Sequence, residues 1–145
     1  MQWEKDRKKI LAMGFILCVL VYYKMYVKVI VEGEVEKMNK LHSLEEVKQF
    51  IETNPLSFIY VLTKSWNVCH ALLPQVEEVL KDFPQIHCGV VDAGEVQEIA
   101  ESFLIFTVPV LLLFVDGKEV LREARIVHVD LFREKINRIY TAILD

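Results

Sequence analysis

Cysteine, glycine and positive charge are all in short supply in this chain of 145 residues, and each shortage excludes a class of protein. The three cysteines contain no Cys-x-x-Cys spacing, so they indicate neither a disulfide framework nor a structural zinc site. The five glycines are scattered and form no phosphate-binding loop. A formal net charge of −4 leaves no excess of lysine and arginine for a phosphate backbone. We therefore expect no cofactor and no nucleic-acid partner.

Two histidine–cysteine pairs come nearest to a metal-binding motif. His70 follows Cys69, and His87 precedes Cys88. Neighbouring residues on a strand point to opposite faces of a sheet, so such a pair does not by itself form a chelating set. We predict no metal site, and we interpret Cys88 as a small core residue.

Composition changes near residue 38. Residues 1–37 open with a basic stretch and continue into an uncharged run of 14 residues from Ile10 to Tyr23. Residues 38–145 instead carry 10 Lys and Arg against 16 Asp and Glu. Over the whole chain 53% of residues are hydrophobic and 26% are charged, which excludes a disordered protein. We predict a hydrophobic helical leader, residues 1–37, followed by one domain, residues 38–145.

Two interpretations of the leader stay open. A membrane-spanning helix needs about 20 apolar residues, and residues 10–31 reach that length if Lys24 and Lys28 extend toward the headgroups. The chain would then be a single-pass protein of the cell membrane, tethered through residues 10–31 with its amino terminus inside. Alternatively, translation starts at Met38, because codons for residues 33–37 can form a purine-rich bacterial ribosome-binding site. That start predicts a cytoplasmic protein.

The hydrophobic pattern of residues 38–145 predicts alternating helices and strands. Ser43, with Glu46 three residues later, predicts a capping box and a helix that ends at Asn54. The other predicted elements are strands at 57–63, 86–92, 110–115 and 119–125 and helices at 69–83 and 96–103, with a last helix capped by Asp130. Asp116-Gly117 predicts a tight hairpin. The fold class is therefore α/β, with a mixed central sheet flanked by helices.

Two segments of this domain resemble the thioredoxin-like family, and the resemblance covers roughly residues 44–144. Residues 65–74 (SWNVCHALLP) resemble the redox loop and the following helix, in which a cysteine precedes a proline by five residues, as Cys69 precedes Pro74. Residues 106–120 (FTVPVLLLFVDGKEV) resemble the family's cis-proline strand and its hairpin. The resemblance implies a thioredoxin fold of the bacterial type, with a cis peptide bond before Pro109.

The resemblance also implies a two-thiol site that this sequence does not complete. In the family, a thiolate at a helix amino terminus attacks a disulfide, and a second thiol resolves the mixed disulfide. Aligned on Pro74, the second thiol is Cys69 and the first position is Trp66. The family's buried acid falls on Tyr60, and the tryptophan that usually precedes the motif is Ser65. Two-thiol exchange is therefore not expected through this loop.

Three hypotheses of function follow. Cys69 is either a single catalytic thiol, which forms mixed disulfides with protein thiols or disulfides or with a low-molecular-weight thiol, or a remnant of a lost two-thiol site. Alternatively, the domain is a non-catalytic module that binds polypeptide at a groove formed by Trp66, Val108 and Pro109. The resemblance implies that the backbone of Val108 bonds to bound peptide there. In the third hypothesis, a membrane-tethered domain only docks to a partner.

Overall fold

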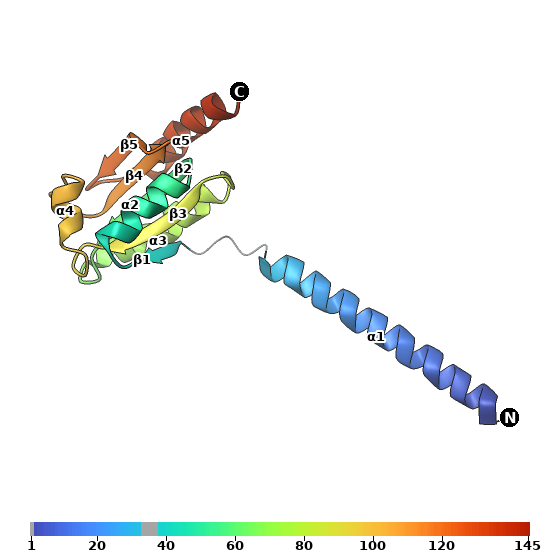
Figure 1. Cartoon of the computed structure of the whole chain (residues 1–145). Coiled ribbons are helices and arrows are strands. Elements are labelled where there is room, and N and C mark those ends of the chain that lie inside the picture. The colour runs from blue at the N-terminus through green and yellow to red at the C-terminus, as the bar shows by residue number, and fades with distance from the viewer. Residues whose placement is uncertain (1, 33–37) are drawn as a thin grey trace. The chain divides into compact units, whose positions relative to one another are not determined.

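The computed structural model describes residues 2–32 and 38–145, and its side chains are described for residues 3–22 and 38–145. The chain divides into two units, Met1–Val35 and Glu36–Asp145. Helix α1 (Gln2–Glu32) lies in the first unit (Figure 1). The side chains of residues 3–22 are exposed, and Arg7 lies 5.9 Å above the ring of Trp3. The proposed start of translation at Met38 stays a prediction.

The predicted single-pass anchor through residues 10–31 is wrong. Among the residues that the structure describes, no helix is both long and apolar enough to cross a bilayer. The physical reason lies in the length of the uncharged run, since 14 helical residues rise about 21 Å where the hydrocarbon core is about 30 Å thick. Charged residues at both ends of this run keep it from becoming longer.

The second unit contains a five-stranded mixed sheet (Figure 1), as the sequence predicts. In chain order its elements are β1 (Asn39–Leu41), α2 (Leu44–Thr53), β2 (Leu56–Leu62), α3 (Asn67–Leu80), β3 (His87–Asp92), α4 (Glu98–Ser102), β4 (Val110–Val115), β5 (Lys118–Ala124) and α5 (Val129–Leu144). The strand order across the sheet is β1-β3-β2-β4-β5. Strand β3 pairs in parallel with both β1 and β2, whereas β4 pairs antiparallel with β2 and β5.

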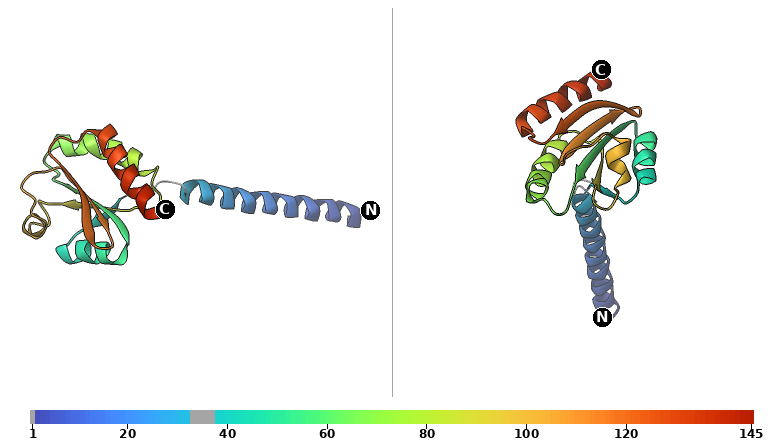
Figure 2. Two further views of the ribbon diagram at one scale, coloured as in Figure 1. Left: turned by 90° about the horizontal axis from the view of Figure 1, so that it is seen from above. Right: turned by 90° about the vertical axis from the view of Figure 1, so that its left-hand side faces the viewer.

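Helices cover both faces of this sheet, α2 and α4 on one face and α3 and α5 on the other (Figure 2). Strand β2 is buried along its whole length, and its side chains alternate between two hydrophobic clusters. Phe58, Tyr60 and Leu62 enter the cluster on the α3 side, while Ile59 and Val61 enter the cluster on the α2 side. A nearly continuous apolar run therefore forms a strand at the centre of the sheet, as the sequence predicts.

Several local details differ from the predictions, and three of them concern how an element begins or whether it forms. Strand β1 was not predicted, because three residues are too few to show an alternating pattern; it exists through its pairing with β3. Helix α3 begins at Asn67 instead of Cys69. Helix α5 begins at Val129, so Asp130 lies inside its first turn and does not cap it.

Two turn predictions are confirmed. Asp116 and Gly117 connect β4 to β5 with φ angles of +49° and +78°, and two positive φ angles of this kind are typical of a tight hairpin turn. The peptide bond between Val108 and Pro109 is cis.

Candidate functional site

The loop between β2 and α3 places Trp66 and Cys69 in contrasting environments. Trp66 occupies the amino-terminal cap position of α3, and its indole makes no capping hydrogen bond. The Trp66 side chain is 56% exposed, whereas Cys69, three residues later in the first turn, is completely buried. The backbone N–H of Cys69 donates to the carbonyl of Trp66 at 3.1 Å. The exposed indole of Trp66 and the buried thiol of Cys69 therefore lie within one turn at the start of α3.

Tyr60 lies directly beneath this turn. Its hydroxyl donates a hydrogen bond of 2.9 Å to the backbone carbonyl of Cys69, and the side chains of both residues are completely buried. Burial raises the pKa of Tyr60 well above its usual range, and the nearby Cys69 raises that pKa further. Where the family resemblance places a carboxyl group, this protein therefore holds a neutral hydroxyl that acts as a donor.

The segment around the cis peptide bond reaches the same end of the sheet as this loop. Val110, the first residue of β4, pairs with Val61 near the end of β2 and with Ala124 at the end of β5. Val108 is half-buried and packs against the core cluster that contains Cys69. Pro109 is buried, and its carbonyl accepts a hydrogen bond of 3.2 Å from the backbone N–H of Arg125. One end of the domain therefore holds the three residues predicted to form a groove, Trp66, Val108 and Pro109.

Comparison with known proteins identifies the family. The chain is 49% identical over 105 residues to the thioredoxin-like protein YdfQ of Bacillus subtilis (strain 168), a match that covers 72% of this chain and 94% of that protein. This chain belongs to the thioredoxin-like family. No family model matches the chain.

More distant relatives agree with this membership. The chain is 27% identical over 101 residues to a thioredoxin of Chlamydia pneumoniae, covering 70% of this chain and 98% of that protein. Among solved structures, thioredoxin of Fasciola hepatica matches with a TM-score of 0.64 at 25% identity, over 70% of this chain and 98% of that one. Thioredoxin of Trypanosoma brucei brucei matches with a TM-score of 0.66 at 16% identity, over 74% and 95% of the two chains. The thioredoxin fold predicted from the sequence is confirmed.

Polar contacts hold the start of the loop in this thioredoxin-like domain. The Lys64 ammonium bonds to the Glu95 carboxylate and lies 3.9 Å from the carboxylate of Asp92. The hydrogen bond with Glu95 raises the pKa of Lys64, and the same bond lowers the pKa of Glu95. The carbonyl of Lys64 lies 3.0 Å from Nε2 of His70, which donates to it from the first turns of α3. The loop is therefore tied to β3 on one side and to its own helix on the other.

Several residues at this end of the thioredoxin-like domain were not singled out by the sequence. Val68, Phe106 and Ile126 are 60%, 89% and 77% exposed, although all three are apolar. They lie in three segments far apart in the chain, and sequence position alone does not show that these segments reach one end of a sheet. Together with Trp66, they add exposed apolar side chains to this end of the domain.

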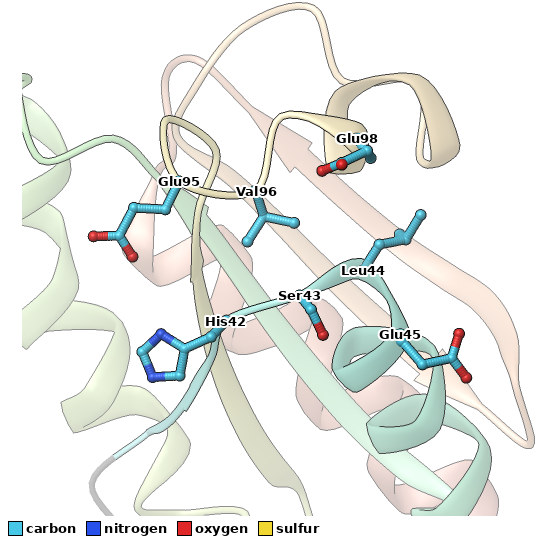
Figure 3. A pocket seen from close by; sticks show the side chains of 7 residues that line it. All are labelled: His42, Ser43, Leu44, Glu45, Glu95, Val96 and Glu98. Carbon is cyan, nitrogen blue, oxygen red and sulfur yellow. The ribbon is translucent and has the colours of Figure 1, made fainter.

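A separate pocket of about 460 Å³ lies at the amino end of α2 (Figure 3). It is lined by His42, Ser43, Leu44, Glu45, Glu95, Val96 and Glu98. Three of these side chains are glutamates, yet among the described residues no group of three His, Cys, Asp or Glu side chains is arranged to hold a metal ion. None of the residues predicted for the groove lines this pocket.

Proposed function

We propose that this thioredoxin-like protein has lost two-thiol exchange and that Cys69 is its only loop thiol. The observation that carries the proposal is the position of Trp66 at the cap of α3, where the family's attacking thiol stands, with Cys69 completely buried behind it. The free N–H groups of an uncapped helix end stabilise a thiolate only if the sulfur is placed there. Here an indole occupies that place.

The chemistry explains why one thiol is insufficient. In exchange, an attacking thiolate forms a bond to one sulfur of a substrate disulfide, and the other substrate sulfur leaves as a thiolate. A second thiol of the same protein then displaces the substrate, which leaves the protein oxidised and the substrate reduced. With Cys69 alone, the cycle would stop at the mixed disulfide until an external thiol displaced it. Proteins that carry thiols or disulfides, or a low-molecular-weight thiol, are the partners that this single-thiol chemistry allows.

Reduction of insulin by dithiothreitol, followed as precipitation of the freed chains, tests the proposal. We expect the wild-type protein to give only the uncatalysed rate, and Trp66→Cys to raise the rate at least about tenfold by restoring a second thiol. Trp66→Phe is the matched control, since it removes the indole without adding sulfur. Wild-type activity that disappears in Cys69→Ser would contradict lost exchange and assign a single-thiol activity to Cys69.

A second candidate function, polypeptide binding without chemistry, is favoured by the 56% exposure of the Trp66 indole beside other exposed apolar side chains. Large aromatic side chains contribute strongly to binding when a partner buries them. In a Trp3→Phe background, Trp66 is the sole tryptophan. Its emission should shift to shorter wavelength when an unfolded polypeptide lacking tryptophan and cysteine is added. An unchanged emission spectrum at saturating polypeptide would contradict this function.

A further inference from the structure

Arg125 adopts a backbone conformation that its side chain disfavours. Its φ angle is +67°, in the left-handed region where a Cβ crowds the backbone and where glycine is the usual residue. Among the described residues, Leu104 and Asp116 are the other non-glycine residues with positive φ. Asp116 belongs to the hairpin turn, and the carbonyl of Leu104 is held by the guanidinium of Arg122. No comparable contact explains an arginine side chain at position 125.

The backbone at this position is fixed by its neighbour in space. The N–H of Arg125 donates to the carbonyl of Pro109 at 3.2 Å, directly after the last residue of β5. Glycine could make the same bond without strain, so the hydrogen bond accounts for the conformation but not for the arginine. What the arginine adds is an exposed cationic side chain on a residue whose backbone bonds to the proline of the predicted groove.

The surroundings leave this guanidinium available to a ligand. Arg125 is exposed, and within the described parts of the chain it makes no salt bridge. Two exposed apolar side chains belong to the same segments: Ile126 follows Arg125 in the chain, and Phe106 precedes the cis-proline by three residues. An unpaired cation next to apolar surface is suited to a ligand that offers both a carboxylate and an apolar stretch.

We propose that Arg125 is a specificity-determining residue, which makes the groove at Trp66, Val108 and Pro109 select extended polypeptide segments that carry an acidic side chain. The proposal rests on the polypeptide-binding function and deepens it. Arginine binds carboxylates through two parallel hydrogen bonds, which fixes the position of the acid as well as attracting it. Because residues 38–145 carry 16 acidic against 10 basic residues, long-range attraction does not favour an acidic ligand, and selection depends on this local contact.

Binding of two matched hexapeptides to the full-length Trp3→Phe protein tests the inference. The peptides are uncharged at both ends, contain valine and serine, and differ only in having glutamate or glutamine at their second and fifth positions. Emission of Trp66 reports their dissociation constants. We expect the glutamate peptide to bind at least about tenfold more tightly at low salt, with the difference decreasing as salt screens the ion pair.

Three variants identify the cause of such a preference. Arg125→Gln keeps the strained backbone and removes the charge, so the preference should fall below about twofold. Arg125→Lys should retain part of it. Arg125→Gly should abolish the preference while raising Tm by about 4 °C, because the backbone strain is relieved. A gain in stability with a loss of selectivity is not expected of a residue with a purely structural role.

Several results would overturn the inference. Equal affinities for the two peptides, a preference that survives Arg125→Gln, or no binding of either peptide each contradict it. Displacement of the glutamate peptide by micromolar glutathione would assign the site to a small acidic thiol and contradict a polypeptide ligand. The insulin assay is independent of these outcomes, so loss of two-thiol exchange can stand while selection by Arg125 fails. If the unfolded polypeptide shifts Trp66 emission but neither hexapeptide is preferred, binding stands and only the selectivity is wrong.

Discussion

Helices α2 and α3 begin in opposite ways. At the start of α2, Ser43 Oγ accepts a hydrogen bond of 3.1 Å from the N–H of Glu46, and the Glu46 carboxylate accepts one of 2.7 Å from the N–H of His42. At the start of α3, the cap residue is Trp66, whose side chain accepts nothing. The first turn of α3 is instead held by a buried hydrogen bond, which the Tyr60 hydroxyl donates to the carbonyl of Cys69.

The contrast separates a helix start that has side-chain caps from one that exposes an aromatic side chain instead. Side-chain caps satisfy the first N–H groups of a helix and stabilise it by about 1 kcal/mol. The start of α3 lacks this contribution and exposes a large aromatic side chain in its place. Its contacts are a buried hydrogen bond, the bond between Lys64 and Glu95, and the bond from His70 to the carbonyl of Lys64. Three measurements of stability test this comparison.

The largest effect is expected from Tyr60→Phe. Loss of the buried hydrogen bond to Cys69 should lower the free energy of unfolding by about 1 to 2 kcal/mol near pH 8, measured by urea denaturation. The pH dependence gives a second signature, because the pKa of Tyr60 is raised in the folded state. The unfolded state therefore loses the Tyr60 proton at a lower pH than the folded state. The contribution of Tyr60 to stability is complete below pH 10, and above pH 10 the free energy of unfolding falls by about 1.4 kcal/mol per pH unit.

In Tyr60→Phe this alkaline component should be absent, while the titration of other groups continues as in the wild type. Phe58→Leu, a change in the same strand and the same core cluster, is the control, because it perturbs packing and leaves the hydroxyl in place. Identical slopes of stability against pH for wild type and Tyr60→Phe would show that the Tyr60 hydroxyl is not buried in the folded protein, and an unchanged free energy of unfolding near pH 8 would show that it does not hold α3.

A smaller effect is expected at α2. Ser43→Ala should cost about 1 kcal/mol, because the N–H of Glu46 loses its partner. Ser43→Asp, which keeps an acceptor oxygen at the same position, should retain nearly all of the stability. If alanine and aspartate at position 43 were equally stable in urea denaturation, the cap would not be what distinguishes α2 from α3.

The smallest effect is expected from giving α3 the cap that it lacks. Trp66→Asp should be more stable than Trp66→Ala by about 0.5 to 1 kcal/mol, since both remove the indole and only aspartate adds an acceptor. Because both variants lose the contacts of the indole, that loss cancels when their free energies of unfolding are compared. Equal stability would show that the N–H groups at the start of α3 are already satisfied in the wild-type protein.

Local patterns predicted most of the fold. The capping box at Ser43, the apolar run of β2 and the hairpin at Asp116-Gly117 each depend on residues close in sequence, and the structure contains all three. Strand β1 escaped prediction because its three residues become a strand only by pairing with β3. The prediction of a membrane-spanning segment was wrong because an apolar run does not by itself indicate a membrane. The length of the run decides whether it can cross a bilayer.

The site was predictable only in part. The family resemblance, aligned on Pro74, placed Trp66 and Cys69 at the two thiol positions and Tyr60 at the position of the family's buried acid. The sequence did not indicate that the Tyr60 hydroxyl donates to Cys69, nor that Arg125 lies against Pro109. Both contacts join residues on different elements, and neither side chain belongs to a recognisable motif.

By itself, the sequence determined the order of the helices and of strands β2 to β5, the absence of a second loop thiol and the presence of an indole at position 66. These properties follow from residue identity and from interactions over a few positions of the chain. The tertiary structure alone decided that Cys69 is completely buried and that Arg125 adopts a φ angle of +67° beside Pro109. It also decided that a Cβ at position 89 would lie 2.8 Å from Cδ1 of Leu41, so that any residue other than Gly89 requires the Leu41 side chain to shift. Such features depend on the distances between strands and helices that are far apart in sequence, and these distances are set only when the sheet and its two helical layers pack together.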